Sequence, residues 1–239
     1  MKNLSEPPRA DNHKIFNRIA LRYDLFNTVA SWRLDKYWRG KLANKLKGQK
    51  NLQLLDIATG TAELLLAILK SDCEISSAIG VDMSAEMMDV GASKIARRNL
   101  ADKVTFKQVD AADMPFADSS FDVATCVFGV RNFNNPSAGL KQMFRVLKPA
   151  GRVLILEFSL PGNRIFKWGY GLYLRYAIPL IGRIITGDKH AYKYLSRTVE
   201  TFVYGDGFCK MMFAAGFANV RAESLSFGIT TLYSAEKPL

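Results

Sequence analysis

Residues 52–70 read LQLLDIATGTAELLLAILK, and the pattern changes character within this stretch. A short, mostly apolar run ends at Asp56, a loop carrying Gly60 follows, and the residues after Ala62 have helical spacing. An apolar run that ends on an acid and a glycine is typical of a buried parallel strand feeding a loop. The stretch therefore predicts the first strand–loop–helix unit of an α/β sheet.

The same alternation continues outward from this unit. Ser84 is a plausible N-cap for the helix after the second strand. Alternating strands and helices predict an open, mostly parallel sheet with helices on both faces. Strands are predicted at 52–60, 76–84, 104–116, 121–130, 152–160, 218–228 and 229–237, and helices within 12–50 and at 62–70, 84–99, 136–151 and 205–217.

Composition excludes several classes of protein. The chain has 239 residues, of which 49% are hydrophobic, so it can bury a sizeable core and is not disordered. Its cysteines, Cys73, Cys126 and Cys209, are too few and scattered for a disulfide framework and are expected to be core residues. With only two histidines, His13 and His190, no metal site is predicted. We expect a reducing compartment, with His13 solvated and His190 a weak candidate base.

Positive charge is concentrated in two segments. Of the net +11, residues 1–50 carry +8 and residues 162–197 carry +6, whereas residues 51–161 carry −2 and residues 198–239 carry −1. A near-neutral core between two basic segments indicates an anionic partner, either a nucleic acid or a membrane surface.

The second basic segment contains IFKWGYGLYLRYAIPLIGRII, residues 165–185. Aromatic and aliphatic residues with spaced cations favour a lipid headgroup boundary, or a cover over an apolar ligand, over a nucleic acid. A buried connecting helix with a basic rim is the alternative. No membrane-spanning helix is predicted, because Lys167, Arg175, Arg183 and Pro179 interrupt the apolar run.

Acids end the first three predicted strands, at Asp56, Asp82 and Asp110. The loop after Asp56 holds one glycine, which fits neither the dinucleotide fingerprint nor a phosphate-binding P-loop. A cationic ligand that carries a ribose suits such acids, and S-adenosylmethionine is one. We expect Gly60 to approach its amino-acid end, Asp82 to accept from both ribose hydroxyls, and Asp110 to accept from the adenine amino group beside Ala111.

Several motifs resemble one family, the class I methyltransferases that C-methylate the ring of menaquinone and ubiquinone precursors. DIATGT and PF…SFD are shared by many methyltransferases, whereas FGVRN with LEFS is narrower. Ala62, Glu63 and Ala150 depart from the commonest form of the family. The resemblance covers nearly the whole chain and rests on FNRIALRYDLFNTVAS (16–31), DIATGTA (56–62), VDMSAEMM (81–88), DAADMPFADSSFD (110–122), FGVRNF (128–133), RVLKPAG (145–151), LEFSLP (156–161), YKYLSRTVETF (192–202) and FGITTLYSAEKP (227–238).

The resemblance implies a Rossmann-like class I methyltransferase fold with a seven-stranded sheet and a single domain over residues 1–239. Within it we expect an N-terminal helical segment on the substrate side (12–50), a cofactor-binding core (51–161), a basic aromatic insertion after the fifth strand (162–197), and a closing helix with two strands (198–239).

The resemblance also implies a reaction: S-adenosylmethionine-dependent C-methylation of a polyprenylated hydroquinone. Demethylmenaquinol is the first candidate substrate, and a ubiquinone-precursor benzoquinol or another small aromatic is the alternative. Arg131 is expected to stabilise a phenolate, or else to pair structurally with a loop acid, and Tyr23 and Asn132 are expected to contact ring hydroxyls. The implied cofactor-binding residues are Asp56, Gly60, Thr61, Asp82, Met83, Asp110, Ala111 and Val127.

The expected partners follow from this substrate. A prenylated quinol lies in a bilayer, so we expect a cytoplasmic protein that is peripheral at the inner face of the cell membrane, with no nucleic acid. A homodimer stays open. An RNA methyltransferase and a non-catalytic membrane-surface protein remain the rival functions at this point.

Overall fold

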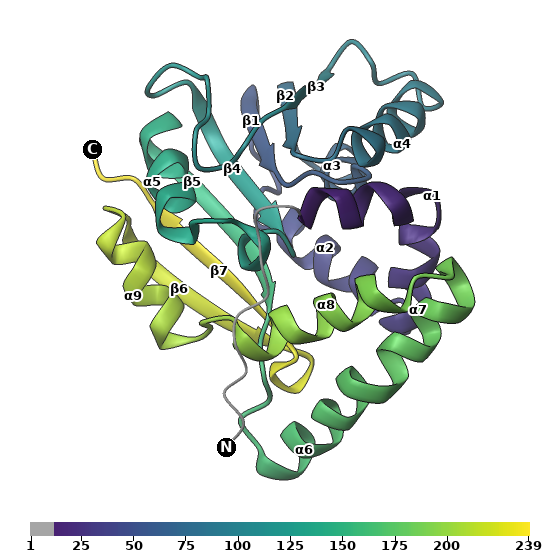
Figure 1. The fold of residues 1–239 in the computed structure, drawn as a ribbon. Helices are drawn as coiled ribbons and strands as arrows, with labels where there is room; N and C mark the ends of the chain where they lie inside the picture. The colour runs from purple at the N-terminus through teal and green to yellow at the C-terminus, as the bar shows by residue number, and fades with distance from the viewer. Residues whose placement is uncertain (1–11) are drawn as a thin grey trace.

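One sheet organises the fold. The computed structural model describes the backbone of residues 12–239 and, within that range, every side chain except those of Asn12, Lys189 and His190. In the described chain the sheet has seven strands in the order β3-β2-β1-β4-β5-β7-β6; β7 is antiparallel to both of its neighbours and the other pairs are parallel (Figure 1). The strands are β1 Leu52–Ile57, β2 Ile75–Asp82, β3 Val104–Gln108, β4 Phe121–Val127, β5 Leu147–Phe158, β6 Ala218–Leu225 and β7 Thr230–Glu236.

Helices cover both faces of the sheet. Apolar side chains of α5 and α9 form one core with β4, β5 and β7, and those of α2 and α3 form another on the opposite face. The helices are α1 Asn12–Ala30, α2 Leu34–Asn44, α3 Glu63–Leu69, α4 Ala85–Ala96, α5 Pro136–Val146, α6 Arg164–Leu172, α7 Ile178–Thr186, α8 Lys189–Thr201 and α9 Asp206–Ala214, with single turns η1 Val130–Asn132, η2 Tyr173–Ala177 and η3 Ser226–Gly228.

A third apolar core lies among helices alone. Residues of α1, α4, η2, α7 and α8 pack together, with Tyr192 fully buried and its ring tilted by 38° against the ring of Phe26. Polar contacts join α1 to the later segment: Arg22 donates to the carbonyl of Ile185, and the Tyr173 hydroxyl donates to the carbonyl of Ala30. Helix α1 from the first basic segment and the helices of the second basic segment therefore form one helical cap beside the carboxyl ends of the strands (Figure 1).

The predicted fold class is confirmed, and so is Ser84 as the N-cap of α4, where its hydroxyl accepts from the amide of Met87. The predicted helix 136–151 is wrong at its end, because α5 stops at Val146 and the following residues begin β5. Pro149 disfavours helical backbone at the residue before it and has no N–H to donate. Ala62 and Ala150, two of the residues that depart from the commonest form of the family that the sequence resembles, both have left-handed backbone with φ of 62° and 61°.

The basic aromatic segment is exposed along much of its length. None of the residues of α6 is buried, so the alternative of a buried connecting helix is wrong for α6. The alternative of a buried helix is correct for the inner sides of α7 and α8, which pack in the third core. Along the described chain, no helix combines the length and the apolar character that crossing a membrane requires.

Candidate active site

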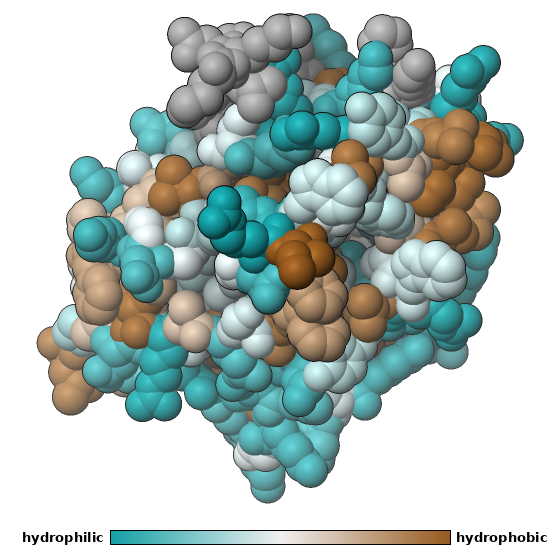
Figure 2. All heavy atoms as spheres, turned by 90° about the horizontal axis from the view of Figure 1, so that it is seen from below, coloured by the Kyte–Doolittle hydropathy of each residue, from teal (hydrophilic) through white to brown (hydrophobic). Residues whose placement is uncertain are grey.

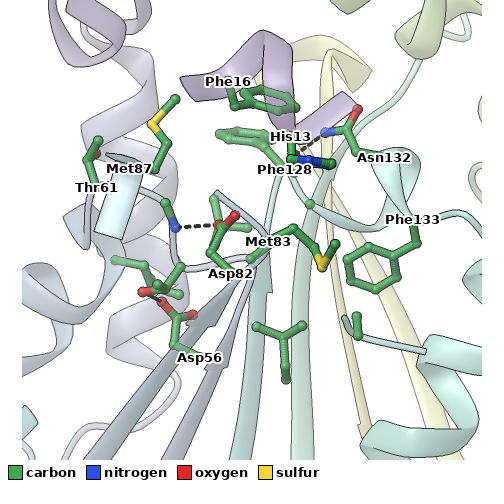
Figure 3. Close-up of a pocket in the computed structure, with 18 of the residues that line it drawn as sticks. His13, Phe16, Asp56, Thr61, Asp82, Met83, Met87, Phe128, Asn132 and Phe133 are labelled. Atoms are coloured by element: carbon green, nitrogen blue, oxygen red, sulfur yellow. Dashed lines mark hydrogen bonds between the residues drawn. The ribbon is translucent and has the colours of Figure 1, made fainter. Parts of the chain in front are cut away.

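An open cavity lies at the carboxyl ends of β1, β2 and β4. Figure 3 shows Asp82 near its centre, with Asp56 deeper at the strand ends and Met83 and Phe133 on one side. All eight residues predicted to bind the cofactor line this cavity: Asp56, Gly60, Thr61, Asp82, Met83, Asp110, Ala111 and Val127.

Asp56 shapes the loop at the floor of the cavity. Its carboxylate is buried and accepts hydrogen bonds from the hydroxyls of Thr59 and Thr125, both at 2.7 Å. Burial raises its pKa to about 6, and the two hydroxyl donors partly offset that rise. Asp56 therefore fixes the loop that carries Gly60, through the hydroxyl of Thr59.

Gly60 and Asp82 form the central part of the cavity. Gly60 has φ of 52°, a backbone conformation that favours glycine, and a Cβ there would meet no atom within 4 Å. Asp82 accepts from the amides of Gly60 and Ser84, both at 2.9 Å, with one on each carboxylate oxygen. Burial raises the pKa of Asp82 against the effect of these amides. Each oxygen of the Asp82 carboxylate has one acceptor position left, and the space over Gly60 beside it is open. This arrangement fits a ligand with two adjacent hydroxyls.

The far side of the cavity suits a flat ring. Asp110 accepts from the amide of Ala112 through one oxygen, at 2.9 Å, and the cavity wall beside it is formed by Met83, Ala111 and Phe133. An apolar slot with one carboxylate at its rim matches an adenine and its amino group. The residues present therefore fit S-adenosylmethionine.

Helix α1 covers the cavity from above. Phe16 and His13 lie over it in Figure 3, and His13 Nδ1 is buried. The prediction that His13 is solvated is therefore wrong, because its helix packs over the strand ends. Thr61 donates its hydroxyl to Asp24 of α1 at 2.6 Å, so this predicted cofactor residue also fastens the helical cap.

A second, mainly apolar cavity adjoins the first. It lies between α1, α2, η2, α8 and the end of β5. Tyr23 and Phe128 line both cavities, so these two side chains stand where the cavities meet. Of the predicted catalytic residues, Arg131 lines the apolar cavity, Asn132 the first cavity and Tyr23 both.

Arg131 is buried and paired. Its Nη1 lies 2.7 Å from Glu157 Oε1 and also donates to the carbonyl of Phe128, while its Nε is buried without a hydrogen-bond partner. The partner acid is on a strand, so the predicted alternative of a structural pair is realised, although with Glu157 of β5 and not with a loop acid. Arg131 also lines the apolar cavity.

Sequence reasoning missed several residues of this cavity. Tyr170 of α6 is half-buried, with its phenol turned into the apolar cavity near Arg131, and loss of water around the hydroxyl raises its pKa. Asp35 and Trp38 of α2 also line the cavity. Helical periodicity could have found Asp35. It lies three residues before Trp38 and seven before Leu42, so its carboxylate is on the apolar face of the helix.

The remaining reactive side chains have structural surroundings. Cys126 is buried in the core, which raises its pKa well above the usual value, and Cys73 and Cys209 pack partly buried against the cores. The prediction that the cysteines are core residues is confirmed for Cys126, whereas Cys73 and Cys209 are only partly buried at the edges of the cores. The expectation for His190 lies outside the described side chains.

Comparisons with known proteins agree with this geometry. Residues 5–237 match the ubiE/COQ5 methyltransferase family. The chain is similar to a demethylmenaquinone methyltransferase of Porphyromonas gingivalis, with 37% identity covering 97% of this chain and 94% of that protein. It is also similar to a ubiquinone/menaquinone biosynthesis C-methyltransferase UbiE of Geotalea daltonii, with 41% identity covering 94% and 95%. A solved SAM-dependent methyltransferase of Thermotoga maritima shares the fold, with a TM-score of 0.67 and 18% identity over 94% and 99% of the two chains.

Proposed function

The chain belongs to the ubiE/COQ5 methyltransferase family, and on that premise we propose that it C-methylates the ring of a prenylated hydroquinone in respiratory quinone biosynthesis. Demethylmenaquinol is the substrate we propose, and a ubiquinone-precursor benzoquinol is the alternative. One observation carries the proposal: a cavity that fits S-adenosylmethionine meets an apolar cavity at Tyr23 and Phe128.

The residues explain how the reaction proceeds. S-adenosylmethionine, when bound, supplies an electrophilic methyl group. A ring carbon becomes nucleophilic when an adjacent hydroxyl releases its proton to water at the open side of the cavity, and the Arg131 guanidinium would stabilise the resulting phenolate without taking the proton itself. After the methyl group has moved from sulfur to carbon, the methylated carbon loses its own proton to water, which restores the aromatic ring and leaves S-adenosylhomocysteine as the other product. The walls of the apolar cavity, including Phe128 and Leu195, exclude water and hold the ring toward the shared boundary. Such positioning of two reactants contributes roughly 7–11 kcal/mol to rate acceleration.

Transfer of labelled methyl from S-adenosylmethionine tests the function. We expect label in demethylated naphthoquinol carrying a short prenyl tail and kept reduced, with less in the matching benzoquinol and none in bulk RNA. Label in the benzoquinol alone would identify the alternative nucleus. Label in RNA alone would overturn the proposal and leave the methyltransferase fold intact.

We also propose that the outer surface of α6, η2 and α7 binds a bilayer of anionic lipids. Trp168 and Ile184 are 70% and 73% exposed, and Arg164, Lys167 and Arg183 on the same segment are exposed cations. Figure 2 faces the end of the molecule where α6 lies and shows hydrophobic clusters separated by hydrophilic residues. Alternating apolar anchors and cations suit a headgroup boundary.

The entrance of the apolar cavity lies beside this surface. Trp32 lines the cavity and is 82% exposed, so it marks the mouth. Its neighbour Tyr173 also lines the cavity and belongs to the basic aromatic segment. A prenyl tail that leaves the cavity beside Trp32 therefore meets the surface that we propose to lie on the bilayer.

A double substitution, Trp168→Glu with Ile184→Glu, tests the bilayer surface. We expect it to lower binding to phosphatidylglycerol vesicles roughly tenfold or more, since it removes two apolar anchors, while methylation of a short-tailed quinol stays unchanged. Phe213→Glu, at an exposed apolar position on α9, is the matched control. Vesicle cosedimentation equal to wild type would contradict the proposal. A dimer in wild type that becomes monomeric in the double variant would assign the surface to self-association instead.

A further inference from the structure

Two buried ion pairs flank an aromatic stack beside the apolar cavity. Phe128 and Phe158 are stacked with ring centroids 4.2 Å apart. The guanidinium of Arg39 lies 5.7 Å from the Phe128 ring, and that of Arg131 lies 5.1 Å from the Phe158 ring. Each arginine is paired with an acid, Arg39 with Asp35 at 2.8 Å and Arg131 with Glu157 at 2.7 Å.

The two pairs present opposite charges to the cavity. In one pair the cation, Arg131, lines the cavity and its carboxylate, Glu157, is fully buried away from it. In the other pair Asp35 lines the apolar cavity, whereas Arg39 lines the cavity that fits the cofactor. Among the described residues that line the apolar cavity, Arg131 is the one cation and Asp35 the one carboxylate.

Asp35 is held firmly but keeps acceptor capacity. One oxygen accepts from the hydroxyl of Ser31 at 2.9 Å and the other from Arg39 Nη1, and the side chain is 7% exposed. A carboxylate has about four acceptor positions, so each oxygen accommodates a further donor. A hydrogen bond to such a charged, desolvated acceptor is stronger than one between neutral groups.

One cation and one carboxylate on the wall of the same cavity provide a partner for each of the two oxygens of a hydroquinone. They lie at opposite ends of the ring, and the reaction needs negative charge on the oxygen adjacent to the methylated carbon. Arg131 suits that oxygen. The oxygen at the other end is a hydroxyl in the reduced ring, which donates a hydrogen bond, and a carbonyl in the oxidised ring, which has none to donate.

Building on the proposed function, we propose that Asp35 accepts a hydrogen bond from the hydroxyl para to the phenolate and thereby selects the quinol over the quinone. In the quinone this position is a carbonyl oxygen, which the Asp35 carboxylate repels. The buried carboxylate then receives no hydrogen bond from the ligand. A site built to pair with a substrate hydroxyl rejects an analogue that lacks it. Asp35 is thus a specificity residue for the reduced ring.

The test is Asp35→Asn, because an amide has the same shape, carries no charge and offers a donor to a carbonyl oxygen. We expect the KM for the quinol to rise roughly tenfold, since a hydrogen bond to a charged acceptor is lost. We expect the Kd for the oxidised quinone to fall, so that the preference for the quinol shrinks. The Kd is measured without cofactor by quenching of tryptophan fluorescence, because Trp32 and Trp38 line the cavity.

Two controls separate selectivity from folding. S-adenosylhomocysteine binding and the unfolding temperature are measured for Asp35→Asn, because Arg39 loses its partner in this variant. In wild type, without any substitution, a naphthoquinol whose distal hydroxyl is replaced by a methoxy group is expected to bind roughly tenfold more weakly than the quinol. This ligand comparison tests Asp35 even if the variant fails to fold.

The results have distinct meanings. Equal affinity of wild type for the quinol, its methoxy analogue and the quinone would overturn the role of Asp35. Methylation of the quinol by the same protein would still support the proposed function. A folded Asp35→Asn that keeps the wild-type ratio of quinol to quinone affinity would overturn it as well. Failure of wild type to methylate either quinol would remove the proposed function, and this inference with it.

Discussion

Replacing Asp82 by alanine is expected to weaken binding of S-adenosylhomocysteine, the demethylated product, by roughly a hundredfold or more. Asp82 stands near the centre of the cavity at the end of β2, and each of its oxygens already accepts one backbone amide. One acceptor position per oxygen is left, which matches the two hydroxyls of a ribose. Each such charge-assisted bond contributes about 1.5–3 kcal/mol. Isothermal titration calorimetry gives the two dissociation constants.

The same substitution also removes the acceptor for the amides of Gly60 and Ser84, so loop order has to be measured separately. Asp82→Asn keeps one acceptor oxygen and the side-chain volume, and we expect it to lose less affinity than Asp82→Ala. Asp89→Ala removes an exposed acid from the neighbouring helix α4 and is the matched control, with wild-type affinity expected. A dissociation constant for Asp82→Ala within a factor of about two of wild type would contradict the assignment of Asp82 to the ribose, given the size of one charged hydrogen bond.

The cofactor cavity was predictable because its residues follow local rules. Asp56 is the penultimate residue of β1 and Asp82 is the last residue of β2, and carboxyl ends of parallel strands meet at one edge of a sheet. Asp56 and Asp82 could therefore be placed together from the sequence alone. Asp110 follows β3 by two residues and lies at the same edge for the same reason.

The apolar cavity was less predictable because it is assembled from helices that are distant in the chain. Asp35 and Tyr170 come from segments more than a hundred residues apart, and helical periodicity does not reveal which helices pack together. His13 was misjudged for the same reason: a polar residue near the start of a helix gives no sign that the helix folds over the strand ends. The end of α5 was a local error, since Pro149 was a sufficient signal to stop the helix earlier.

Replacing Arg131 by glutamine is expected to lower kcat by about a hundred- to a thousandfold, as the loss of one electrostatic stabiliser of a developing anion does. It is also expected to reduce the free energy of unfolding by about 3–5 kcal/mol, because the buried carboxylate of Glu157 loses its partner. Denaturant unfolding measures the second effect and single-turnover methyl transfer the first. A single variant therefore mixes a structural loss with a catalytic one.

The double variant Arg131→Gln with Glu157→Gln separates these two losses. Removing both charges leaves no unpaired buried ion, so most of the lost stability is expected to return. The phenolate still has no guanidinium beside it, so kcat is expected to stay low. Recovery of stability together with wild-type kcat would show that Arg131 serves only to neutralise Glu157. We expect recovery of stability alone, because Arg131 pairs with Glu157 on one side and lines the apolar cavity on the other.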